Sequence, residues 1–137
     1  MVIRHATTDD IPVMLGLFEE LRHAIAAPQA IDRSYVAGQF AALMCTGGLA
    51  LVTEGLDGFL IASIERSRVN PEPVAIEHGW YCRTGHGAIL LRRYEAWARD
   101  RGCAVIRMTT GYEQGRPMKA LQRMGYAPAE VAWVKRL

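Results

Sequence analysis

The sequence lacks any apolar run long enough to cross a membrane. Residues 1–25 mix charged and apolar positions, and no stretch of the 137 residues approaches the ~20 that a spanning helix needs. Blocks of like charge are also missing, because 16 basic and 14 acidic residues leave a formal charge of only +2. No basic stripe of the kind that binds nucleic acid is formed. We therefore expect a cytoplasmic protein that binds neither membrane nor nucleic acid.

Cysteine is scarce as well. Cys45, Cys82 and Cys103 are odd in number and form no CxxC pair and no Cys/His spacing of a zinc site. We expect small buried thiols in a reducing compartment, and no metal.

Hydrophobic residues, in contrast, are plentiful. They make up 50% of the chain, which is enough for a real core and argues against disorder. No repeat, linker or low-complexity tract interrupts the sequence. A chain of this length fits one domain, residues 1–137.

Hydrophobic periodicity predicts the order β-α-α-β-β-β-α-β-α-β. Apolar residues at helical spacing predict helices over residues 11–25, 35–44, 88–101 and 116–124. Strand-like runs lie at residues 2–5, 49–54, 59–67, 74–82, 103–110 and 130–137. Thr8 or Asp9 is expected to cap the first helix, and Asp32 or Ser34 the second. The sequence thus predicts one mixed α/β domain.

The stretch "YCRTGHGAILLRRYEAWARDRG", residues 81–102, runs from a strand through a glycine-rich turn into an amphipathic helix. The first N–H groups of such a helix lack internal partners and favour anions. Gly85 and Gly87 would let phosphate oxygens approach the main chain. The pattern is neither a P-loop nor a dinucleotide fingerprint, and a Gly-x-Gly at a strand–helix junction is more often just a tight turn.

Three stretches together resemble the GNAT N-acetyltransferase superfamily, over nearly the whole chain. They are "IRHATTDDIPVMLGLFEEL", "AIEHGWYCRTGHGAILLRRYEAWARDRGC" and "ALQRMGYAPAEVAWVKRL". The "E-x-W-A" of the middle stretch is similar to compact acetyltransferases of phage and prophage genomes. The resemblance implies an α/β (α+β) domain with a mixed, mostly antiparallel sheet flanked by helices.

The resemblance also implies an activity, namely transfer of an acetyl group from acetyl-CoA to a primary amine by direct attack in a ternary complex. The acceptor would be a small molecule or a peptide, and a homodimer joined through the last strands is compatible with the family. The cofactor-binding residues implied are Trp80, Tyr81, Cys82, Arg83, Thr84, Gly85, His86, Gly87 and Ala88.

Two departures from the family pattern concern the phosphate turn. The motif reads Arg/Gln-x-x-Gly-x-Gly/Ala, and Cys82 stands where Arg or Gln is expected, with Arg83 one place late. The loop before the turn is also short. Either Arg83 substitutes, or main-chain amides supply most of the contacts to the pyrophosphate. A cofactor site damaged by the shortened loop is the third alternative.

Glu77 matches the position of a glutamate base on this strand in some family members, and a buried carboxylate there could accept the amine proton. A solvent-facing strand residue is the alternative, and His78 on the opposite face is a second candidate base. Leu121 stands where many members carry the tyrosine that protonates the leaving thiolate. Tyr112 and Tyr126 are the hydroxyls left for that role, and Tyr126 is our candidate. A non-catalytic acyl-CoA-binding or interaction domain with the same fold remains the alternative function.

Overall fold

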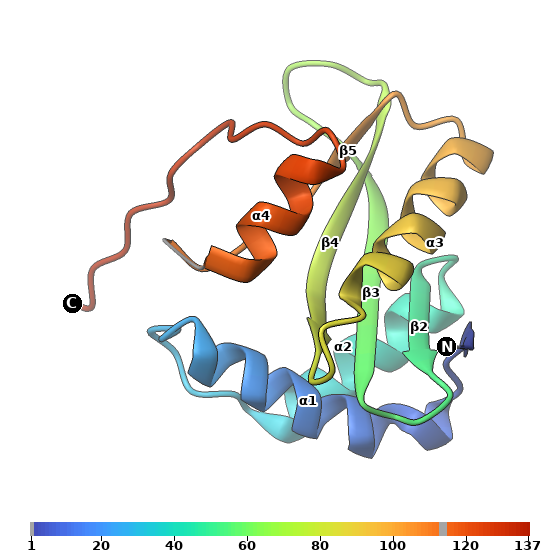
Figure 1. Ribbon diagram of the computed structural model, residues 1–137, viewed down its shortest axis with the longest axis vertical. Helices are drawn as coiled ribbons and strands as arrows, with labels where there is room; N and C mark the ends of the chain where they lie inside the picture. The colour runs from blue at the N-terminus through green and yellow to red at the C-terminus, as the bar shows by residue number, and fades with distance from the viewer. Residues whose placement is uncertain (1, 113–114) are drawn as a thin grey trace.

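A five-stranded sheet lies at the centre of the chain (Figure 1). The computed structural model describes residues 2–112 and 115–137. The strands are β1 (Ile3–His5), β2 (Leu49–Thr53), β3 (Gly58–Arg66), β4 (Pro73–Cys82) and β5 (Val105–Arg107), in that spatial order. Strands β1 to β4 pair antiparallel, and β5 pairs parallel to β4. The sheet is therefore mixed and mostly antiparallel, as expected.

Helices cover both faces of this sheet. They are η1 (Thr8–Asp10, a 3-10 turn), α1 (Ile11–Ala24), α2 (Arg33–Cys45), α3 (Gly87–Asp100) and α4 (Gly115–Arg123). Side chains alternate along β2, so Leu49 and Leu51 pack with α3 and α4, whereas Ala50 and Val52 pack with α1 and α2. All of β2 is consequently buried. No helix in the described ranges is long and apolar enough to cross a bilayer.

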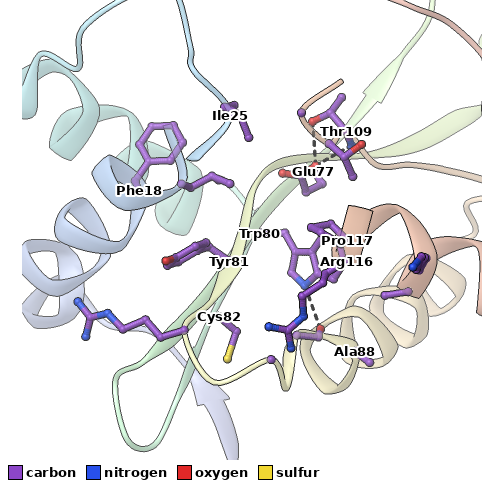
Figure 2. Close-up of a pocket in the computed structure, with 18 of the residues that line it drawn as sticks. Phe18, Ile25, Glu77, Trp80, Tyr81, Cys82, Ala88, Thr109, Arg116 and Pro117 are labelled. Carbon is purple, nitrogen blue, oxygen red and sulfur yellow. Dashed lines mark hydrogen bonds between the residues drawn. The ribbon is translucent and has the colours of Figure 1, made fainter. Parts of the chain in front are cut away.

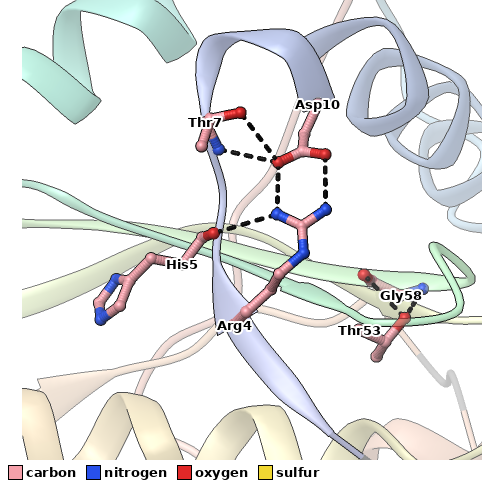
Figure 3. Close-up of polar contacts among 6 residues, drawn as sticks. All are labelled: Arg4, His5, Thr7, Asp10, Thr53 and Gly58. Carbon is pink, nitrogen blue, oxygen red and sulfur yellow. Dashed lines mark hydrogen bonds and ion pairs between the residues drawn. The ribbon is translucent and has the colours of Figure 1, made fainter.

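A carboxylate joins the first strand to the first helix (Figure 3). Asp10 accepts two bonds from the Arg4 guanidinium, at 2.8 and 2.9 Å, and one from the backbone N–H of Thr7 at 2.8 Å. The Arg4 hydrogen bonds hold the pKa of Asp10 down, at about 2. The cap is thus Thr7 together with Asp10, rather than Thr8 or Asp9, because a 3-10 turn precedes α1. At the second helix Asp32 is the cap, accepting from the N–H of Tyr35.

The predicted strand over residues 130–137 is wrong. Residues 127–137 carry no regular structure, and the Trp133 side chain is 91% exposed. An alternating sequence favours a strand only where another strand offers a partner, and β5 offers an edge of only three residues instead of the predicted eight. The tail instead leaves the end of α4 and runs away from the sheet (Figure 1), and Arg136 donates to the carbonyl of Pro28.

The cysteines are also less buried than expected. All three are free thiols; Cys45 is exposed, and Cys82 and Cys103 are half-buried. Cys45 is the last residue of α2, and its neighbours Leu43 and Met44, rather than Cys45, pack against the core.

Candidate active site

The two strands at the parallel edge of the sheet diverge and open a cavity between them. Pairing of β4 with β5 stops at Ile76 and Arg107, whereas β4 continues to Cys82. Beyond Ile76 the backbone of β4 therefore has no strand partner on this side. The cavity has a volume of about 640 Å³. Residues from α1, β4, the turn before α3, the loop after β5 and α4 line it.

A bulge in β4 decides which side chains face this cavity. The register with β3 shifts between two neighbouring residues, because Ile61 pairs with Gly79 whereas Ala62 pairs with Glu77. His78 has no partner on β3 and is the extra residue of the bulge. Without the extra residue, Trp80 would lie on the α1 face, because side chains alternate along a strand. The bulge instead brings Trp80 to the face of α3 and α4 that Glu77 also shares.

Glu77 is a buried carboxyl, only 6% exposed, and lines the cavity. The backbone N–H and the hydroxyl of Thr109 donate to its Oε1 at 2.9 and 3.1 Å (Figure 2). Burial raises the pKa of Glu77 to about 7, and the two Thr109 bonds limit the rise. A solvent-facing position is therefore excluded. A carboxyl with this pKa changes its protonation state near neutral pH, as a general base must.

His78, the other candidate base, is directed elsewhere. Its Nε2 lies 2.7 Å from the hydroxyl of Ser63 and 3.7 Å from the carboxylate of Glu65, on the exposed part of β3. His78 borders the cavity, but these polar partners hold its ring at the strand surface.

The turn between β4 and α3 lies at the end of the cavity opposite Glu77 (Figure 2). Gly85 adopts φ +77°, which favours glycine. No side chain of the described residues caps the N-terminus of α3, so its first N–H groups have no side-chain acceptor. Gly87 has a different reason to be glycine: a Cβ there would lie 3.0 Å from Nε1 of Trp80, which donates to the Gly87 carbonyl.

Arg83, expected to contact phosphate, is held away from the turn. Its guanidinium donates three bonds to Glu20 of α1, the shortest 2.7 Å long. The Glu20 hydrogen bonds raise the pKa of Arg83, so its guanidinium stays charged. The charge of Arg83 is therefore balanced before any ligand arrives.

The remaining predicted binding residues divide into two groups. The cavity is lined by Trp80, Tyr81, Cys82, Arg83, Gly85, Gly87 and Ala88. Thr84 and His86 are not among its lining residues; the Thr84 hydroxyl lies 3.3 Å from Sγ of Cys82 instead.

The structure places the candidate acid Tyr126 away from the cavity. Its hydroxyl is buried against the core on the side of Glu95 and has no hydrogen-bond partner of good geometry among the described residues. Burial raises the pKa of Tyr126, which makes it a poor proton donor. Tyr112 is exposed, and Leu121 is part of the core. We therefore assign no tyrosine to the leaving group.

Three cationic side chains that the sequence reasoning missed also line the cavity. Arg116, Lys119 and Arg123 follow each other at spacings of three and four, which places them on one face of α4. This spacing is the signal that could have found them, but only the fold turns that face toward the cavity. No cluster of His, Cys, Asp or Glu suited to a metal ion occurs in residues 2–112 and 115–137.

Comparison with known proteins finds likeness in structure only. No protein-family model and no curated protein matches the sequence. A putative acetyltransferase from Agrobacterium tumefaciens superposes with a TM-score of 0.75 at 18% identity, over 100% of both chains.

Two further solved structures carry more specific descriptions. A predicted acetyltransferase from Clostridium acetobutylicum, solved with acetyl-CoA, has a TM-score of 0.77 at 14% identity, covering 99% of this chain and 95% of its own. An aminoglycoside antibiotic 6'-N-acetyltransferase from Acinetobacter haemolyticus superposes with a TM-score of 0.70 at 21% identity. The match covers 100% of this chain and 99% of that one. At these identities the likeness establishes the fold, and the expected GNAT fold is confirmed.

Proposed function

We propose that this protein transfers an acetyl group from acetyl-CoA to a primary amine, by direct attack of the amine in a ternary complex. One observation carries the proposal. A buried carboxyl with a pKa near 7 lines the cavity between two diverging strands, in a fold shared with an acetyltransferase solved with acetyl-CoA.

The residues present fit acetyl-CoA, the co-substrate that this fold implies. The uncapped start of α3, with the Arg116 guanidinium beside the turn at Gly85, suits a pyrophosphate. The unpaired backbone of Trp80 to Cys82 offers N–H and C=O groups to an extended pantetheine arm, as a neighbouring strand would. When bound, acetyl-CoA supplies an activated acetyl group as a thioester.

Glu77 is the base in this mechanism. Its carboxylate accepts a proton from the ammonium of the acceptor, directly or through a water, and leaves a nucleophilic amine. The amine nitrogen then bonds to the thioester carbon, and N–H groups of β4 stabilise the negative charge on the carbonyl oxygen. As the C–S bond breaks, the surplus proton of the nitrogen passes to the departing thiolate, directly or through water, which leaves a neutral amide and CoA thiol. Because a thiol is acidic enough to leave as a thiolate, no tyrosine is needed at position 121.

The acceptor would enter from the side of α1. Phe18, Leu21 and Ile25 form an apolar wall there, and Tyr81 lies across from Phe18 (Figure 2). A wall of this kind suits a small molecule that carries an amine on an apolar body. That one similar structure is an aminoglycoside acetyltransferase supports a small-molecule acceptor as a class.

Calorimetry with acetyl-CoA, followed by a thiol-release assay over a broad amine panel, tests the proposal. We expect binding at micromolar to submillimolar concentration and release of CoA with at least one amine. Absence of binding at millimolar acetyl-CoA would refute the proposal. Binding without transfer to any amine would favour a non-catalytic acyl-CoA-binding domain.

A further inference from the structure

The cationic face of α4 is unusual because no carboxylate among the described residues balances its charge. Arg116, Lys119 and Arg123 line the cavity, and no carboxylate in the described parts of the chain forms an ion pair with them. The described acidic residue on the cavity's lining is Glu77, at the buried end. Three unbalanced cations on one wall make that wall attractive to an anion.

Arg116 is the member of this face that reaches the turn before α3. A Cβ built on Gly85 would lie 2.6 Å from one of its guanidinium nitrogens, so the guanidinium occupies the space beside the Gly85 backbone. Figure 2 shows the side chain extending from α4 toward this turn, next to Trp80 and Pro117. The cation and the uncapped start of α3 therefore face the same small volume.

Arg83 cannot supply the same charge without losing its own partner. Its guanidinium is bound to Glu20 through both Nε and a terminal nitrogen, and its side chain is half-exposed. Turning toward the phosphate site would break this pair and leave Glu20 uncompensated. Arg116 has no such contact to give up among the described residues.

We propose that Arg116 is the residue that binds the pyrophosphate of CoA, in the role that neither Cys82 nor Arg83 fulfils. This inference rests on the proposed function and names a binding residue within it. A guanidinium donates two parallel N–H bonds to phosphate oxygens, and the N–H groups at the start of α3 bind the same group from the other side. The phosphate is thus held between two helices, α3 and α4.

Isothermal titration with three probes tests this role. CoA carries the pyrophosphate and a 3'-phosphate, dephospho-CoA keeps only the pyrophosphate, and pantetheine has neither. We expect Arg116→Ala to weaken both CoA and dephospho-CoA at least about 10-fold, and to leave pantetheine, measured by displacement, within about 2-fold. Arg116→Gln, which keeps the length of the side chain, should behave like the alanine variant if the charge is what matters.

Two comparison variants make the test specific. Arg99→Ala removes the same charge from the exposed side of α3, where Arg99 pairs with Glu95 outside the cavity, and should change no affinity by more than about 2-fold. Arg83→Ala should cost less CoA affinity than Arg116→Ala. Circular dichroism confirms that each variant is folded.

The outcomes separate this inference from the proposed function. If the wild-type protein binds no CoA, the proposed function fails and the inference fails with it. If the wild type binds CoA but the two Arg116 variants bind it equally well, Arg116 is not the phosphate residue, while the proposed function stands. A loss seen with CoA but not with dephospho-CoA would assign Arg116 to the 3'-phosphate and overturn the inference.

Discussion

Glu77 owes its chemistry to two features of its surroundings. It is buried between diverging strands, which raises its pKa, and Thr109 donates two bonds to one of its oxygens, which fixes the carboxyl in place. Replacing the acid by an amide keeps an oxygen that accepts from Thr109. Glu77→Gln is therefore a variant in which the proton-accepting role is lost and the position is kept.

We expect Glu77→Gln to lower kcat about 100-fold or more, with little change in acetyl-CoA affinity. The wild-type kcat/KM should rise with pH through a pKa near 7, because the base must be ionised, and this rise should disappear in the variant. Steady-state rates between pH 5.5 and 9 with any accepted amine measure both effects. Unchanged turnover would remove Glu77 from the role of base.

The sequence could single out Glu77 as a candidate base, but it could not place Arg116 at the cavity. Glu77 stands at a position that a family pattern singles out, so a resemblance was enough. Its burial and the bulge at His78 were not readable, because they follow from the register between β3 and β4. The position of Arg116 depends on how α4 packs across from a turn 30 residues earlier in the chain, which no local pattern encodes.

At the scale of elements, Trp80 holds β4 to the first turn of α3. Its indole N–H donates to the carbonyl of Gly87 at 2.9 Å, and the nearest ring atom lies only 3.0 Å from where a Cβ of residue 87 would be. One strand residue thus fixes the position at which the helix begins. The contact also holds in place the first turn of α3, whose Gly87 and Ala88 line the cavity.

We expect Trp80→Phe to reduce the free energy of unfolding by about 1–2 kcal/mol, because one half-buried hydrogen bond is lost and the Gly87 carbonyl loses its donor. Urea unfolding followed by far-UV circular dichroism measures the change. Trp133→Phe is the matched control. Because Trp133 is exposed on the tail, this variant should unfold at the wild-type urea midpoint. Equal midpoints for all three proteins would contradict the role given to the indole.

The junction of β1 with α1 is a second element-scale contact, and it is acid-sensitive. The pKa of Asp10 is lowered to about 2 in the folded protein, below its usual value of 3.8. Its contribution to stability is therefore present above pH 4 and is lost as the pH falls toward 2.

Asp10→Asn should lower the free energy of unfolding by about 1–2 kcal/mol at pH 7, because the ion pair with Arg4 and part of the cap are removed. The loss should shrink between pH 4 and pH 2. Urea unfolding at pH 7, 4 and 2.5 checks this. A difference that stays constant over this range would show that the charge of Asp10 is not what stabilises the junction.

On the scale of the whole molecule, the order of elements was largely predictable and the edge of the sheet was not. Strong periodicity placed α1, α3 and the three long strands within one or two residues of their observed ends. The runs at 103–110 and 130–137 have the same strand-like composition but became three residues of β5 and an irregular tail. Edge strands depend on partners rather than on their own sequence, so composition alone could not decide them.

The tail should add little to the stability of the isolated chain. Its contacts include an exposed ion pair of Glu130 with Arg107 and the Arg136 bond to Pro28. We expect deletion of residues 130–137 to shift Tm by less than about 2 °C, because exposed polar contacts contribute little. Differential scanning calorimetry of both chains measures this. A fall of more than about 5 °C would show that the tail packs against the domain in solution.

The short pairing of β4 with β5 also sets a distance. The opening between β4 and β5 begins after their last pair, Ile76 and Arg107, one residue before Glu77. In the proposed complex, an extended pantetheine arm that enters between the strands would stop there, with its thioester beside the carboxyl of Glu77. A strand rises about 3.3 Å per residue. If β4 and β5 paired over one more residue, the thioester carbon would therefore stop too far from the carboxyl of Glu77 for proton transfer.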